Sequence, residues 1–338
     1  MRSYVKYKMV KKSNHRLVYF NGNYVPENEA KVSIYDSSLM FGDMIFEMTR
    51  SFKKKHFKLE EHIERLFVGL KILRININMT QKQMYDACLE TANVNNHLFD
   101  KEDEHRLMID VSRGLLGIYH GVEGLHKGSN VIIADFPLKW TVRGMGKLFD
   151  QGINAVITSQ RVIPSSLMDP KIKNRSRLFY LMANIEVSQF KGENNWALML
   201  DPDGYIAEGS GDNFLIVKDG VVISPEGRNM LKGVSRSYVM KELCSKLNIH
   251  VIEKNIEPYD VYNADEAFMT GTPFCMLPVT KLNNVNIGNG KVGNIYKKIL
   301  KKWSSNTGVD IEKQIKSWDK KDSIGFNKKS RAPTPYKF

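Results

Sequence analysis

Short apolar stretches that alternate with tight turns fill the second half of the chain, and they constrain its fold more than any other feature. Strands are predicted at 153–158, 196–200, 213–217, 221–223 and 267–270, and helices at about 175–190 and 235–248. Pro202-Asp203-Gly204 and Lys218-Asp219-Gly220 separate neighbouring strands, and these residue types favour turns. Helices and strands mixed in this way indicate a domain of the α+β class.

The first half predicts a smaller α+β domain. Its clearest element is a hairpin over 17–25, where Asn21-Gly22 supplies the positive φ angles of a tight turn. Further elements are predicted as a strand at 31–35, helices at 57–76 and 81–93, and strands at 106–111 and 131–136. The stretch 139–151 is less regular, contains Gly144 and Gly146, and is predicted to connect two domains.

The basic residues of the chain are concentrated at its two ends. Residues 1–16 carry six Lys/Arg and no acid, residues 301–338 carry ten basic and four acidic residues, and 17–300 carry 34 basic against 33 acidic residues. We therefore predict a basic N-terminal extension (1–16), a small domain (17–138), an interdomain loop (139–151), a large domain (152–304) and a basic C-terminal extension (305–338). A nearly neutral core without an aromatic-basic RNA motif makes a nucleic-acid-binding protein the least favoured class.

The cysteines and the hydropathy pattern indicate the compartment. Cys88, Cys244 and Cys275 lie far apart and in no metal-like spacing, which argues against a disulfide framework and predicts no metal site. The first 16 residues contain no apolar stretch of signal-peptide length, and no later stretch approaches a membrane span. The expectation is a cytoplasmic protein without a membrane partner.

Lys173 and Glu208 are the main candidates for chemistry. A lysine can hold an aldehyde cofactor as a Schiff base, and a carboxylate beside a pyridine nitrogen keeps that nitrogen protonated. Glu208 begins the run Glu208-Gly209-Ser210-Gly211, whose small residues allow close approach to a flat ligand. Taken singly, Lys173 is expected to be a solvated surface group and Glu208 part of a surface turn.

Two turns and one arginine are candidates for binding a phosphate. Leu231-Lys232-Gly233-Val234-Ser235-Arg236 places glycine and a hydroxyl residue where a helix begins, although Ser235 could equally be an ordinary N-cap. Thr270-Gly271-Thr272 follows a predicted buried strand. Arg65 could contribute a guanidinium, or it could be a solvated charge beside Glu61 and Glu64.

An ordered set of motifs resembles the class IV, branched-chain type aminotransferases, which have the fold type IV architecture of pyridoxal-phosphate enzymes. The motifs are Phe41-Gly42-Asp43, His62-Ile63-Glu64-Arg65-Leu66, Lys173, Glu208-Gly209, Gly233-Val234-Ser235-Arg236 and Gly271-Thr272, and the resemblance spans roughly residues 17–300. It implies two α/β domains joined by an interdomain loop, the large one binding pyridoxal 5'-phosphate, and a homodimer with the site between the domains.

The resemblance also implies a role for each matching residue. Lys173 would form the Schiff base and move the proton between substrate and cofactor, and Glu208 would hold the ring nitrogen. The phosphate contacts would come from Arg65, the Gly233-Val234-Ser235 turn and Thr272. Lys173 matches the family lysine better than Lys171 does, because of its distance from Glu208 and its place ahead of the helix.

Substrate recognition cannot be carried over from the relatives. Pro273 and the bulky Phe274 stand where the branched-chain type presents two small residues whose N–H groups meet the substrate carboxylate, and proline has no N–H. The D-amino-acid type has an Arg-x-His trap after the position of Arg113-Gly114, and this chain lacks it. Candidates to replace these groups are Arg106, Arg143 and Arg177, each of which could instead be structural. Phe41, Phe46 and Phe274 are candidates to favour an apolar substrate.

The sequence thus predicts an aminotransferase that passes an amino group from an apolar amino acid, branched-chain first, to a 2-oxo acid such as 2-oxoglutarate by a ping-pong mechanism. Pro164-Ser165-Ser166 with Asp169-Pro170 resembles the (R)-selective amine transaminases, and Phe41-Gly42-Asp43 with Val111-Ser112-Arg113-Gly114 resembles the D-amino-acid transaminases. An aminodeoxychorismate lyase remains an alternative on the same scaffold.

Overall fold

The computed structural model describes residues 13–321, which form two compact units. The first unit extends to Leu138 and also contains Asn174–Ser176, and the second contains Lys139–Lys173 and the chain from Arg177 onward. The expected N-terminal extension lies mostly outside the described residues, as does the part of the expected C-terminal extension beyond 321. Within the described range, no helix combines the length and the apolar character that a membrane crossing requires.

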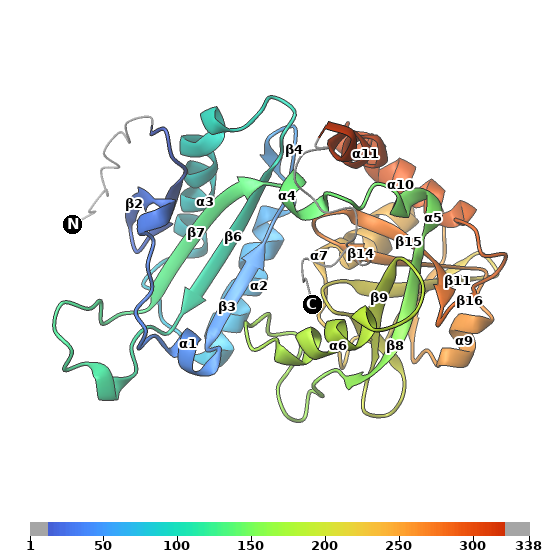
Figure 1. Ribbon diagram of the computed structural model, residues 1–338, viewed down its shortest axis with the longest axis horizontal. Helices are drawn as coiled ribbons and strands as arrows, with labels where there is room; N and C mark the ends of the chain where they lie inside the picture. The colour runs from blue at the N-terminus through green and yellow to red at the C-terminus, as the bar shows by residue number, and fades with distance from the viewer. Residues whose placement is uncertain (1–12, 322–338) are drawn as a thin grey trace. The chain divides into compact units, whose positions relative to one another are not determined.

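The first unit is built on a five-stranded sheet in the order β2-β1-β7-β6-β3 (Figure 1). Its strands are β1 (Leu17–Phe20), β2 (Asn23–Pro26), β3 (Met44–Met48), β6 (His105–Ser112) and β7 (Asn130–Pro137), and β4 (Ser51–Phe52) pairs with β5 (Lys55–His56) beside them. The predicted hairpin is confirmed, since β1 and β2 pair antiparallel across Asn21-Gly22. The predicted strand at 31–35 is wrong, because these residues form a loop leading to the short helix α1 (Ser37–Phe41).

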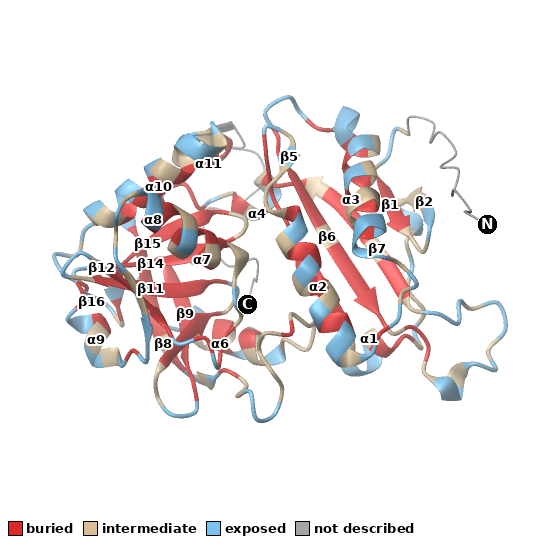
Figure 2. Ribbon diagram, turned by 180° about the vertical axis from the view of Figure 1, so that it is seen from behind, coloured by how far each residue is buried: buried red, intermediate tan, exposed pale blue. Residues whose placement is uncertain are grey.

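Two helices cover one face of this sheet, and both were predicted. They are α2 (Leu59–Leu73) and α3 (Gln81–Asn95), and a Thr80/Gln83 capping box begins α3. Each buries one apolar side and exposes the other, as Figure 2 shows for α2. Gly69 of α2 approaches Ile45 so closely that a Cβ there would lie 3.2 Å from that side chain. The inner face of β3 therefore meets α2 directly.

The second unit contains a nine-stranded sheet that closes on itself. Its strands are β8 (Ile153–Arg161), β9 (Asn195–Leu200), β10 (Ile206–Gly209), β11 (Asn213–Lys218), β12 (Val221–Pro225), β13 (Val251–Lys254), β14 (Glu266–Gly271), β15 (Cys275–Leu282) and β16 (Val285–Asn286). Since β10 pairs with both β9 and β11, six strands form a ring in the order β10-β9-β8-β15-β14-β11. The prediction omitted β10, β13, β15 and β16.

The helices of the second unit surround this sheet. They are α4 (Lys139–Val142), α5 (Leu148–Gln151), α6 (Leu178–Ser188), α7 (Val234–Tyr238) continuing through a π-helical turn (Val239–Leu243) into α8 (Cys244–Lys246), α9 (Pro258–Tyr262), α10 (Asn294–Thr307) and α11 (Ile311–Lys321). Two short helices thus occupy the stretch that was predicted to be a loop at 139–151. The expected appendage from 305 onward differs as well, because α11 buries Ile311, Ile315 and Trp318.

Candidate active site

Glu208 lies on β10, in the interior of the second unit. Its side chain is 3% exposed, so the alternative of a surface turn is wrong for this residue. A register shift between Ile206 and Glu208 marks a β-bulge against β9, and bulges commonly re-aim side chains next to functional sites. The Glu208 carboxylate accepts hydrogen bonds from the Tyr180 hydroxyl at 2.6 Å, the Leu231 backbone N–H at 3.1 Å and the Asn213 amide at 3.2 Å.

The surroundings of Glu208 set its pKa. Burial raises the pKa to about 7, while the hydrogen bonds from Tyr180 and Leu231 and the charges of Arg177 and Lys173 act in the opposite direction. The carboxyl group is therefore close to half ionised at neutral pH when no further donor is present. A cationic N–H placed beside it would favour the ionised form.

Lys173 and Glu208, the two main candidates of the sequence, lie in the same unit. The positive charge of Lys173 lowers the pKa of the Glu208 carboxyl group. Lys173 lies five residues ahead of α6, in the segment that precedes the helix. Lys171 is engaged elsewhere: its ammonium group lies 2.9 Å from the Asp169 carboxylate and donates to the carbonyl oxygen of Arg228. The structure thus distinguishes the two neighbouring lysines by their surroundings.

The predicted phosphate-binding turn is bonded directly to Glu208. Besides the Leu231 N–H, Asn213 links the two features, because its amide donates both to Glu208 and to the carbonyl oxygen of Leu231 at 2.8 Å. Gly233 is required at its position, since a Cβ there would lie 2.1 Å from Oδ1 of Asn213. Hydrogen bonds therefore fix the position of the 231–236 turn relative to the Glu208 carboxylate.

The start of α7 offers backbone N–H groups to an anion. Gly233 is the N-cap of α7, and no side chain in the described part of the chain caps this end. Ser235 is the second residue of the helix, so the alternative that it is an ordinary N-cap is wrong. On β14, Thr270 is directly opposite Asn213, and its hydroxyl group is buried without a partner among the described residues. Thr272 follows two residues later and is half-buried.

Arg65 lies on α2 in the first unit, where it binds Glu47. The Arg65 guanidinium donates to the two carboxylate oxygens of Glu47 at 2.6 and 2.8 Å, and His62 Nδ1 contacts the same carboxylate at 2.7 Å. Burial opposes ionisation of Glu47, yet the charges of Arg65 and His62 hold its pKa well below the usual range. Arg65 is half-buried and bound to Glu47, so the alternative of a solvated charge does not describe it.

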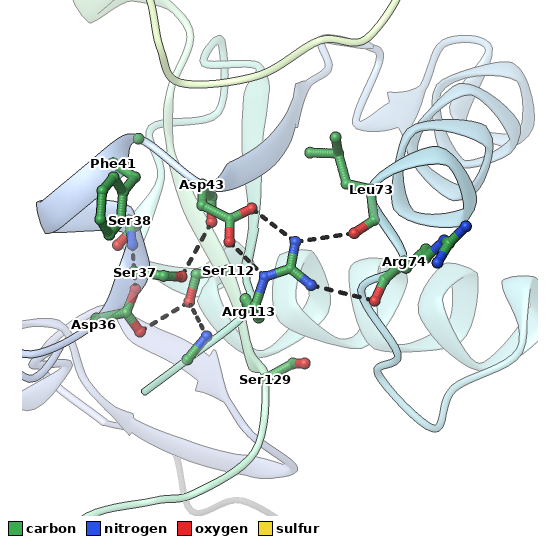
Figure 3. Close-up of polar contacts among 12 residues, drawn as sticks. Asp36, Ser37, Ser38, Phe41, Asp43, Leu73, Arg74, Ser112, Arg113 and Ser129 are labelled. Carbon is green, nitrogen blue, oxygen red and sulfur yellow. Dashed lines mark hydrogen bonds and ion pairs between the residues drawn. The ribbon is translucent and has the colours of Figure 1, made fainter. Parts of the chain in front are cut away.

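Polar contacts hold the Phe41-Gly42-Asp43 motif in place (Figure 3). Asp36 caps α1 by accepting from the Ser38 N–H at 2.8 Å, and it also accepts from the Ser112 hydroxyl at 2.9 Å. Arg113 binds Asp43 at 2.6 and 3.2 Å and donates to the carbonyl oxygen of Leu73. The motifs at 41–43 and 111–114, which lie far apart in the sequence, are therefore joined by an ion pair.

The candidate substrate residues lie in different surroundings. Phe41 is 67% exposed on the first unit, whereas Phe46 is buried there and lies under the guanidinium group of Arg175. Phe274 is 3% exposed in the second unit, with its ring against Trp196. Arg143 lies near Asp319, also in the second unit. Of the three phenylalanines, only Phe41 is exposed within its own unit.

Sequence reasoning missed Tyr180 and Arg177 as neighbours of Glu208. Tyr180 is placed by α6, which packs against β8 and β9 through Ala183 and Val187. Arg177 donates to the carbonyl oxygen of Ser210 at 2.8 Å, and its guanidinium lies 4.1 Å from the centre of the Tyr180 ring. Spacing gave no signal for Tyr180, and Arg177 had been considered only as a partner for the substrate carboxylate.

Comparison with known proteins defines the class of this chain. The family profile described as amino-transferase class IV matches residues 44–282. A putative branched-chain-amino-acid aminotransferase of Methanocaldococcus jannaschii is 36% identical over 85% of this chain and 94% of its own length. This chain therefore belongs to the class IV aminotransferases, and it is an aminotransferase.

Solved structures agree with this assignment. The T.th. branched-chain amino acid aminotransferase complexed with N-(5'-phosphopyridoxyl)-L-glutamate has a TM-score of 0.74 at 27% identity, covering 87% of this chain and 95% of that chain. The same enzyme with pyridoxamine 5'-phosphate has a TM-score of 0.75 at 26% identity, with the same coverage. The fold is the α+β architecture of fold type IV.

Proposed function

We propose that this aminotransferase uses pyridoxal 5'-phosphate to move an amino group from a branched-chain or similar apolar amino acid to a 2-oxo acid such as 2-oxoglutarate, in two successive half-reactions. One arrangement carries the proposal. The buried carboxylate of Glu208 accepts a hydrogen bond from the Leu231 N–H, in the segment that leads to the start of α7. In the same unit, the positive charge of Lys173 lowers the pKa of Glu208.

The residues of the second unit fit this cofactor. The start of α7 has no side-chain cap within residues 13–321, and helix N-terminal N–H groups favour a phosphate. The Thr270 hydroxyl, which has no hydrogen-bond partner in the same range, lies on the strand next to Asn213. Gly233 lets the turn approach closely, and Thr272 supplies a further hydroxyl group. Glu208 would accept a hydrogen bond from the ring nitrogen. Arg65 is assigned to the phosphate by the resemblance alone.

The cofactor supplies an aldehyde that reacts with amines and a ring that withdraws electrons from the substrate Cα. Glu208 would keep the ring nitrogen protonated, because an ionised buried carboxylate is stabilised by a cationic partner. Tyr180 and Asn213 hold the carboxylate in position for this bond. The Lys173 amine would hold the aldehyde of the cofactor and would serve as the base and acid at the substrate carbon.

The choice of a branched-chain donor is supported by the relatives, which carry that name. The choice of two half-reactions follows from a single cofactor that must receive and then give one nitrogen. A homodimer is part of the proposal, as implied by the family resemblance.

The test compares the visible absorbance of the protein loaded with pyridoxal phosphate for wild type, Lys173→Ala and the matched control Lys171→Ala. We expect the cofactor band in wild type and in K171A, its loss or shift in K173A, and a fall in activity of at least about 10³-fold in K173A alone. L-amino acids, D-amino acids and (R)-amines are offered in parallel, with 2-oxoglutarate as acceptor.

The results distinguish the alternatives. Conversion of L-leucine and L-valine with formation of glutamate supports the proposal. Preferential conversion of D-amino acids or (R)-amines assigns the chain to one of the other transaminase types, and pyruvate formed without an acceptor assigns it to the lyase type. A K171A protein that loses the band while K173A retains it would overturn the role of Lys173.

A further inference from the structure

Asn229 is buried at a point where three segments of the second unit meet. The residue is 7% exposed, and its side-chain amide is bonded at both ends. Oδ1 accepts a hydrogen bond from the backbone N–H of Ser165 at 3.2 Å, and Nδ2 donates to Oδ2 of Asp201 at 3.1 Å. Asn229 itself belongs to the segment that leads into the 231–236 turn. One side chain therefore links the 162–173 segment, the turn after β9 and the approach to α7.

Each of these segments leads to a group that the proposed function uses. Ser165 lies eight residues ahead of Lys173, in the connection between β8 and α6. Asp201 directly follows β9 and precedes β10, the strand of Glu208. Leu231 lies two residues beyond the linking amide and donates its N–H to Glu208. The amide is thus connected over short stretches of chain to both main candidates for chemistry.

The Asp201 end of this link is fixed by the backbone around it. Oδ1 of Asp201 accepts from the N–H groups of Asp203 and Tyr205, both at 3.0 Å, and the Asp201 N–H donates to the Tyr205 carbonyl oxygen at 2.8 Å. Asp201 is 5% exposed, and a buried carboxylate is stable only with such donors. Asn229 is therefore bonded to a turn whose geometry is set independently, and it holds Ser165 against that turn.

A second contact joins the same segments at the surface. The ammonium group of Lys171 donates to the carbonyl oxygen of Arg228 at 3.3 Å and lies 2.9 Å from the Asp169 carboxylate. The side chains of Lys171 and Asp169 are 35% and 38% exposed, and exposed ion pairs contribute little stability. The buried amide of Asn229 is therefore the stronger of these two contacts.

We propose that Asn229 is a positioning residue, which holds the segment carrying Lys173 in place relative to Glu208 and the 231–236 turn. This inference rests on the proposed function, because it concerns the groups assigned there to the cofactor. Attachment joins the Lys173 nitrogen to the aldehyde carbon of pyridoxal phosphate and releases one water, so the amine must reach a carbon whose place is set by the other contacts. A misplacement of about 1 Å can slow a reaction about 10²-fold.

Two forms of the cofactor separate this role from general support of the fold. Pyridoxal 5'-phosphate can attach to Lys173, whereas pyridoxine 5'-phosphate has an alcohol in place of the aldehyde and binds without attachment. Both carry the ring nitrogen and the phosphate that Glu208 and the 231–236 turn would hold. Displacement of the Lys173 segment should therefore weaken binding of the aldehyde alone, while a general loss of structure should weaken binding of both.

The test measures the dissociation constants of both compounds by isothermal titration calorimetry on the full chain freed of cofactor. The dissociation constant of the alcohol divided by that of the aldehyde is the aldehyde preference, and Lys173→Ala gives its value without attachment. We expect Asn229→Ala to lower the preference at least about tenfold, which corresponds to about 1.4 kcal/mol. Asn263→Ala removes an exposed amide of the same unit, which donates to the Tyr259 carbonyl oxygen, and should leave the preference unchanged.

An exchange of donor and acceptor tests the link itself. Asn229→Asp places a second carboxylate against that of Asp201 and should lower the preference, because two buried carboxylates repel each other. The double variant D201N/N229D reverses the donor and the acceptor and keeps an acceptor for the Ser165 N–H. It should restore the preference to within about threefold of wild type, because every hydrogen bond of the link can form again.

A preference that is the same in N229A and wild type, and higher than in K173A, would overturn this inference and leave the proposed function standing. If N229A does not fold, as judged by circular dichroism, the exchange decides the matter. A preference at least about threefold lower in N229D than in D201N/N229D supports the inference, and equal values overturn it. A wild type whose preference is no higher than that of K173A would contradict the role of Lys173, and the proposed function and this inference would then fall together.

Discussion

The surroundings of the Glu208 carboxyl group oppose its ionisation. Its carboxyl group is buried and accepts three hydrogen bonds, and burial outweighs them in raising the pKa to about 7. A carboxyl group in this condition is ready to pair with a cationic donor, because the pair relieves the cost of burial. At the scale of one residue, this is the property that makes β10 suitable for a pyridine nitrogen.

This pKa predicts how stability depends on pH in the cofactor-free protein. The folded-state pKa, about 7, lies above the ordinary value of 4.5, so between these values the folded state binds more protons than the unfolded state. Stability from this group is therefore full below about pH 4.5 and is lost as the pH rises through 7. The loss amounts to about 3 kcal/mol. Glu208→Gln should remove this slope, so the variant gains stability relative to wild type between pH 5 and pH 8.

Urea unfolding followed by circular dichroism at several pH values measures the slope. Glu186→Gln is a suitable control, because the Glu186 carboxylate accepts its hydrogen bonds from the exposed Ser159. Parallel curves for wild type and E208Q over this pH range would contradict the raised pKa of Glu208.

At the scale of elements, α11 is part of the second unit. Asp319 accepts hydrogen bonds from the N–H groups of Gly144 at 2.6 Å and Gly146 at 2.7 Å, and Trp318 is buried. Gly146 lies close to this helix, since a Cβ there would lie 2.5 Å from the Asp319 carboxylate. The helix thereby holds the stretch 143–146, which follows α4.

We expect Trp318→Ala to lower the free energy of unfolding by about 3–5 kcal/mol, because it leaves a cavity. Asp319→Ala should cost about 1–3 kcal/mol through the loss of two acceptors for backbone N–H groups. Lys313→Ala, on the exposed side of α11, should change stability by less than about 0.5 kcal/mol. Chemical denaturation of the three variants measures these values, and equal stability for all of them would show that α11 does not contribute to the core.

At the scale of the whole molecule, the first unit displays apolar side chains that suit a second copy of the chain. Large exposed side chains occur on and before α1, namely Ile34, Leu39, Met40 and Phe41. Ile118 is 80% exposed on a neighbouring turn, and the stacked rings of Tyr35 and Tyr119 join the two segments. Large apolar side chains that are exposed on adjoining segments commonly mark a protein interface.

Light scattering after gel filtration tests the proposed homodimer. We expect wild type at about twice the chain mass of 38.8 kDa, and Leu39→Glu shifted toward the monomer because it places a charge in the apolar patch. Val68→Glu, at an exposed position of α2, should remain dimeric. A monomeric wild type would contradict the dimer, and a dimeric L39E would move the interface elsewhere.

Periodicity located the long elements and failed at the short ones. The strands β6 and β7 and the helices α2 and α3 were predicted because their apolar residues recur over several strand positions or helical turns. The short strand β10 was missed, because its four residues, Ile206–Gly209, end in Glu-Gly and resemble a turn. Its burial comes from β9 and β11, which pair with it on either side.

The sequence by itself determined the class of enzyme. Each motif can be recognised from its own residue types, and the motifs occur in the order Lys173, Glu208, the 233–236 turn and the 271–272 turn. Only the tertiary structure decided which groups surround them. Tyr180 meets Glu208 across 28 residues, and Asn213 joins Glu208 to Leu231. Nε and Nη1 of Arg106 are buried with no hydrogen-bond partner among the described residues. Hydrogen bonding and burial depend on which strands close the sheet, and no local pattern records that.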